Sequence, residues 1–83
     1  MPLEHTGQPQ NTHQHRRLLA QGFPGGVFWV KHGVPYVVFP DFDCAEYWGP
    51  GPVREVHPFW PLLGGQRISD IEFLARVREI HGI

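Results

Sequence analysis

Residues 27–39 read VFWVKHGVPYVVF, and this stretch decides the fold. Two runs of β-branched and aromatic residues flank a short polar turn, which is the pattern of a β-hairpin. His32 and Gly33 stand where a two-residue hairpin loop needs positive φ. With that loop, cross-strand partners share a face of the ribbon. One face then carries Val27, Trp29, Tyr36 and Val38, and the other carries Phe28, Val30, Val37 and Phe39.

Both faces of this hairpin are apolar, whereas an antiparallel strand with one solvated face alternates apolar and polar residues. Each face therefore needs a cover, either from the rest of the chain or from a partner. Pro35 lacks an N–H group, which predicts a sheet edge or a bulge at its position.

The rest of the chain predicts a small α+β domain. Residues 12–21 are expected to form a short helix, residues 53–57 a third strand, and residues 69–82 the best helix. In that last helix Ser69 and Glu72 make a capping box, and Gly82 ends it. The predicted architecture is a three-stranded antiparallel sheet packed against the C-terminal helix, in the order αβββα.

Three other segments complete this prediction. Residues 1–11 have no hydrophobic periodicity and are interpreted as a flexible N-terminal arm, so that residues 12–83 form the single domain. Residues 43–48 are expected to form one helical turn. Residues 57–65 are expected to be an apolar loop that packs onto the protein, because exposing its large side chains is costly.

Length, charge and cysteine content exclude several classes of protein. A chain of 83 residues makes one domain with a small core. Its single cysteine excludes an internal disulfide, and its net charge of −1 is not that of a typical nucleic-acid binder. No stretch has the length and apolarity of a membrane span or a signal peptide. We therefore expect a cytoplasmic protein that binds neither membranes nor nucleic acids directly.

Two groups of residues could hold a metal ion. Asp41, Asp43 and Glu46 could offer oxygen ligands to Mg²⁺ or Ca²⁺, or they could simply cap and turn the chain. The histidines at positions 5, 13 and 15 fit a polar tail better than a zinc site, which prefers four pre-organised ligands. We expect no cofactor.

No catalytic residue is predicted. Cys44 and His57 are a nucleophile and a base in principle, but nothing in the sequence around Cys44 suggests an activated thiol. The more ordinary interpretation of Cys44 is a small, partly buried apolar residue.

The aromatic residues are too many for one small core. Tryptophan and tyrosine are favoured at interfaces, where they supply contact area at low entropic cost. Loops that fold back over the sheet explain the excess equally well. The candidate interaction residues are Trp29, Tyr36, Tyr47, Trp48 and Trp60.

Part of the chain resembles one stretch of a toxin family. The residues that carry the resemblance are Gly33-x-Pro35, Pro40-Asp41-Phe42, Gly65-x-Arg67, Asp70 and Gly82-Ile83. They are similar to the segment upstream of the Trp-His-His signature in HNH/endonuclease VII-type bacterial toxin nucleases. The resemblance implies that the signature would begin near Ile83, so it assigns no catalytic residue to this chain. It also implies a truncated or repurposed relative of those nucleases.

Three functions follow as hypotheses. The first is a small non-enzymatic protein-interaction module, a regulator or inhibitor that binds another protein or a second copy of itself through the aromatic sheet face. The second is a truncated or repurposed HNH-type toxin nuclease domain. The third is a metal-binding domain that uses Asp41, Asp43 and Glu46.

Overall fold

The computed structural model describes residues 22–82. The predicted arm at 1–11, the predicted helix at 12–21 and the histidines at positions 5, 13 and 15 lie outside that range. In chain order the elements are β1 (Val27–Lys31), β2 (Val34–Phe39), the 3-10 turn η1 (Pro40–Phe42), β3 (Cys44–Tyr47), β4 (Arg54–Val56), α2 (Phe59–Leu62), β5 (Gln66–Arg67) and α3 (Asp70–His81).

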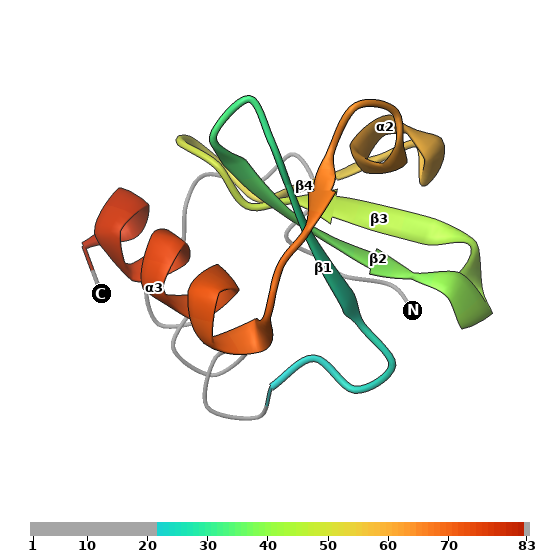
Figure 1. Cartoon of the computed structure of the whole chain (residues 1–83), viewed down its shortest axis with the longest axis horizontal. Helices are drawn as coiled ribbons and strands as arrows, with labels where there is room; N and C mark the ends of the chain where they lie inside the picture. The colour runs from blue at the N-terminus through green and yellow to red at the C-terminus, as the bar shows by residue number, and fades with distance from the viewer. Residues whose placement is uncertain (1–21, 83) are drawn as a thin grey trace.

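The strands form one antiparallel sheet in the order β4-β3-β2-β1-β5 (Figure 1). The hairpin has the predicted register, with Trp29 opposite Tyr36. Its loop residues His32 and Gly33 have φ of 54° and 77°, as a two-residue loop of this kind requires. The α+β class and the C-terminal helix are confirmed, but the sheet has five strands where three were predicted.

Residues 44–47 were predicted as helical and are instead strand β3. The chain reverses at η1, where Asp43 adopts a left-handed conformation (φ 51°) and its N–H bonds to the Pro40 carbonyl at 3.2 Å. This turn returns the chain alongside β2, so that Cys44 pairs with Phe39. Pairing with a formed neighbour overrides the weak strand propensity of the β3 sequence, Cys-Ala-Glu-Tyr.

Pro35 lies in the central strand, at the point where β3 ends. Trp48 lies opposite it, just beyond β3, and its N–H donates to the Pro35 carbonyl at 2.9 Å. In a regular ladder the amide of residue 35 would donate back to the Trp48 carbonyl, which proline cannot do. His81 Nε2, from the last turn of α3, lies 3.1 Å from that carbonyl oxygen. The end of α3 thus takes the place of the missing amide.

Helix α3 begins and ends as predicted. The Ser69 hydroxyl accepts a hydrogen bond from the Glu72 N–H at 3.1 Å, and Gly82 has φ of 69°. Only half of the capping box forms, because the Glu72 carboxylate accepts from Arg76 at 2.9 Å instead of reaching back to the cap.

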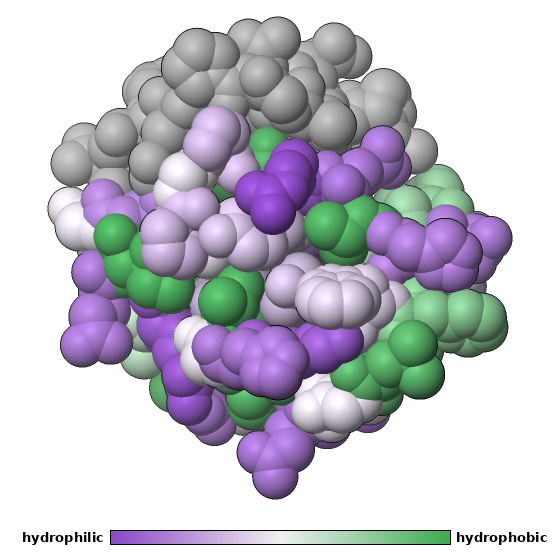
Figure 2. Space-filling view, turned by 90° about the horizontal axis from the view of Figure 1, so that it is seen from above, coloured by the Kyte–Doolittle hydropathy of each residue, from purple (hydrophilic) through white to green (hydrophobic). Residues whose placement is uncertain are grey.

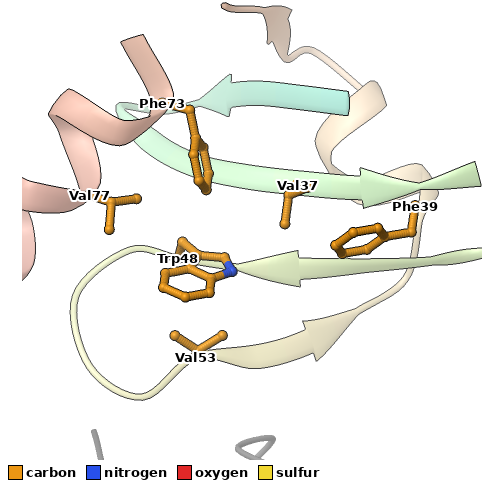
Figure 3. Packing of buried hydrophobic residues seen from close by; sticks show 6 residues of the cluster. All are labelled: Val37, Phe39, Trp48, Val53, Phe73 and Val77. Atoms are coloured by element: carbon orange, nitrogen blue, oxygen red, sulfur yellow. The ribbon is translucent and has the colours of Figure 1, made fainter. Parts of the chain in front are cut away.

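The two faces of the sheet are covered by different helices. α3 lies on one side of β1 and α2 lies toward the other (Figure 1). The core is on the α3 side, where Phe73 and Val77 point from the helix toward β2 and Trp48 (Figure 3). The buried core residues are Val37, Phe39, Trp48, Val53, Phe73 and Val77. Within residues 22–82 no helix is long and apolar enough to cross a membrane.

Candidate functional site

The sheet face opposite the core carries a continuous row of aromatic and cationic side chains. We call this side the α2 face. Because cross-strand partners share a face, the strand pairing lines up one residue from each strand. In spatial order the row is Arg54, Tyr47, Tyr36, Trp29 and Arg67.

Side-chain contacts join three neighbouring members of this row, Arg54, Tyr47 and Tyr36. The rings of Tyr36 and Tyr47 meet edge to face, with centroids 5.8 Å apart. The Arg54 guanidinium carbon lies 3.8 Å from the centroid of the Tyr47 ring, which is a cation–π arrangement. The Tyr47 hydroxyl donates to the Pro50 carbonyl at 2.8 Å in an exposed position.

α2 is attached to this face through Trp60. The Trp60 indole N–H donates to the Tyr36 hydroxyl at 2.8 Å. The Lys31 ammonium lies 3.2 Å from the centroid of the Trp60 ring and donates to the Trp60 carbonyl at 2.9 Å. Lys31 is 7% exposed, so this cation is enclosed between the sheet and α2. Only glycine fits at position 65, because an added Cβ would overlap the Pro61 carbonyl oxygen of α2.

The structure brings together four of the five predicted interaction residues and separates the fifth. Tyr36 is buried under Trp60, while Trp29 and Tyr47 are half-buried and Trp60 is 46% exposed. Trp48 is fully buried on the α3 side, where its indole N–H donates to Glu46 at 3.0 Å. It therefore belongs to the core and is left out of the candidate surface.

The outer side of α2 supplies apolar residues that the sequence interpretation did not assign to the site. Residues 57–65 do pack onto the sheet, through the buried Pro61 and the contacts of Trp60. Phe59 is nevertheless 63% exposed, Leu62 39% and Leu63 65%. The sequence signal for these residues is the density of large apolar side chains within residues 57–65, and such density ordinarily predicts burial.

Two hollows flank the segment that leads into α2. The larger, of about 530 Å³, lies between α2 and the sheet, and its residues are Val27, Trp29, Val38, Pro40, Asp43, His57, Pro58, Phe59 and Leu62. The smaller, of about 440 Å³, is lined by Tyr36, Arg54, Val56, His57 and Trp60. Seen from above, the end of the molecule that carries α2 shows hydrophobic residues beside hydrophilic ones (Figure 2).

His57 lines both hollows and shapes α2. Its Nδ1 accepts a hydrogen bond from the Phe59 N–H at 3.1 Å, which satisfies a donor at the start of the helix. The rings of His57 and Phe59 lie 5.5 Å apart. We interpret His57 as a residue that positions α2 between the two hollows.

The acidic residues Asp41, Asp43 and Glu46 are not brought together. Asp41 and Asp43 are exposed at η1, whereas Glu46 is fully buried on the α3 side of β3. The alternation of side chains along β3 turns Glu46 toward the core. Among residues 22–82 no group of three or more His, Cys, Asp or Glu residues is placed to hold a metal ion.

Cys44 has the properties of an unreactive thiol. Burial raises the pKa of the Cys44 thiol, and the negative charges of Glu55 and Glu46 raise it further. A raised pKa lowers the fraction of thiolate, which is the nucleophilic form. We therefore interpret Cys44 as a structural residue and not as a nucleophile.

No protein-family model matches the chain, and no curated protein or solved structure is significantly similar to it. The resemblance to the toxin nucleases stays an interpretation of the sequence. Its residues have structural roles here: Gly33 turns the hairpin, residues 40–42 form η1, Gly65 allows close packing with α2, and Asp70 begins α3.

Proposed function

We propose that the protein is a cytoplasmic interaction module, a regulator or inhibitor of another protein, and that it binds through the α2 face. The observation that carries this proposal is the exposure of Phe59, Trp60, Leu62 and Leu63 on one short segment. Contiguous apolar surface of this kind on a small domain marks an interaction site more often than a random surface does.

The construction of the segment supports a binding role. α2 has four residues and is held to the sheet by Trp60 and the buried Pro61, while Phe59 and Leu62 stay exposed. Phe59 and Leu62 also border the 530 Å³ hollow, so a partner that covers them can fill the hollow at the same time. Apolar side chains around a concavity, with charged residues at the margin, form the usual plan of an interface core and rim.

The experiment is affinity capture from cells that make the protein, with the full chain as bait. Leu63→Ser is compared with Ile71→Ser, because the two apolar residues are similarly exposed, at 65% and 77%. They differ in place, since Leu63 adjoins α2 and Ile71 lies on α3. We expect Leu63→Ser to lose the captured partner and Ile71→Ser to keep it. Equal retention by both variants would remove the α2 face from the proposal.

A further inference from the structure

The charged residues of the strands are segregated by face. On the α2 face the strands present Lys31, Arg54 and Arg67, and their cross-strand positions carry no acidic residue. The acidic strand residues, Glu46 and Glu55, are paired with each other on the α3 face. A chain of net charge −1 thus concentrates the positive charge of its sheet on the face proposed to bind.

Of these three cations only Arg54 lines one of the two hollows; Lys31 and Arg67 line neither. The Lys31 ammonium is enclosed beneath Trp60. Arg54 is exposed, and it borders the 440 Å³ hollow beside Trp60 and His57. Its guanidinium rests on the Tyr47 ring, an arrangement that holds the group in place while its N–H edge stays available for an acceptor.

The other hollow has a different character. Its lining is mainly aliphatic, aromatic and proline side chains, and the charged residue at its margin is Asp43. An anionic group would be repelled at the Asp43 end and attracted at the Arg54 end. The face therefore offers an apolar hollow and a cationic hollow, with His57 common to both.

We propose that the partner presents an acidic peptide segment, in which an aspartate or glutamate carboxylate pairs with Arg54 and a nearby apolar side chain enters the 530 Å³ hollow. This inference rests on the proposed function and names the chemistry of the ligand. Carboxylates are the natural partners of a stacked guanidinium, because its planar N–H groups match the two carboxylate oxygens.

The same face is poorly suited to single-stranded nucleic acid, the other common anionic ligand of aromatic surfaces. Stacking of bases needs open aromatic rings. Tyr36 is 5% exposed, and one side of the Trp60 ring is occupied by the Lys31 ammonium. The ring surface that remains is small, whereas the apolar hollow suits an aliphatic side chain.

The test uses the full chain and two pools of short fluorescent peptides with the same content of leucine, phenylalanine and proline. The charged positions are glutamate in one pool and lysine in the other. Fluorescence anisotropy should show binding of the glutamate pool in preference to the lysine pool, and the binding should weaken as salt is added. Arg54→Gln should reduce affinity for the glutamate pool by about tenfold, as expected for loss of a charge-assisted hydrogen bond.

The matched control is Arg78→Gln, which makes the same change at an exposed position on α3 and should leave binding unaltered. Equal binding of the two pools, or equal effects of the two variants, would overturn the inference. So would preferential binding of a single-stranded oligonucleotide. If neither pool binds while Leu63→Ser still loses the captured partner, the proposed function stands and the acidic segment is refuted.

Discussion

Replacing Tyr36 by phenylalanine should loosen α2 while leaving the core intact. The change removes the hydroxyl that accepts the Trp60 indole N–H at 2.8 Å. A hydrogen bond of this kind contributes on the order of 1 kcal/mol, and Trp60 is 46% exposed, so water can satisfy the released donor in part. A loss of about 1 kcal/mol corresponds to an increase of roughly fivefold in the population of the undocked segment.

Amide hydrogen exchange measures that population directly, because local opening exposes the amides of the segment that opens. The amides to follow are those of Trp60 and Leu63, which bond to the His57 and Phe59 carbonyls at 2.9 and 3.0 Å. Both should exchange about fivefold faster in the variant, as the estimated free-energy change implies. The Phe73 amide, bonded to Ser69 at 2.9 Å in α3, should be unaffected.

The control variant is Tyr47→Phe, which removes a hydroxyl of the same kind from the same row. That hydroxyl donates to Pro50 in an exposed position, where water replaces it at little cost. If Tyr36→Phe leaves the Trp60 and Leu63 amides unchanged, the contact does not hold α2. If the Phe73 amide accelerates equally, α2 and the core open together and the segment is not a separate unit.

Two further predictions concern the core and the free thiol. Val77→Ala should reduce the free energy of unfolding by about 1–3 kcal/mol, because the lost burial of two methyl groups and the cavity left behind outweigh a helix-propensity gain of about 0.6 kcal/mol. Ile71→Ala, at a position 77% exposed on the same helix, should cost less than about 0.5 kcal/mol. Urea unfolding measures both, and equal costs would contradict the placement of the core. The raised pKa of Cys44 predicts slower alkylation by iodoacetamide at pH 8 in the folded chain than in the urea-unfolded chain. Because the unfolded thiol loses its proton first, stability should also fall as pH rises through the ordinary thiol pKa, and Cys44→Ala should remove that part of the pH dependence.

Local sequence chemistry accounts for the parts of the fold that could be predicted. The loop of His32 and Gly33 determines the hairpin register, and Ser69 with Gly82 delimits α3. Strand β3 was missed because its identity comes from pairing with β2 and not from its own propensity, and because Glu46 occupies a core-facing position where a charged residue is unexpected. Strand β5 has two residues, which is too short for any periodicity to appear.

The sequence predicts the residues that the hairpin contributes to the candidate site, but it does not predict which residues of the α2 segment are exposed. The hairpin register already placed Trp29 and Tyr36 on one face. Trp48 was misplaced because the turn that makes β3 a strand also places the residue after it on the core side. The exposure of Phe59 and Leu63 depends on how Trp60 docks against Lys31 and Tyr36, which is a long-range contact that residues 57–65 do not encode by themselves.

The most direct test of the α2 face is photo-crosslinking inside the cells that make the protein. A photoreactive amino acid is placed at position 63 in one full-length chain and at position 71 in another, because both native side chains are large, apolar and exposed. If the α2 face binds a partner, position 63 should give a discrete crosslinked species that position 71 does not give. Crosslinks of equal yield from both positions, or a discrete species from position 71 alone, would contradict the account.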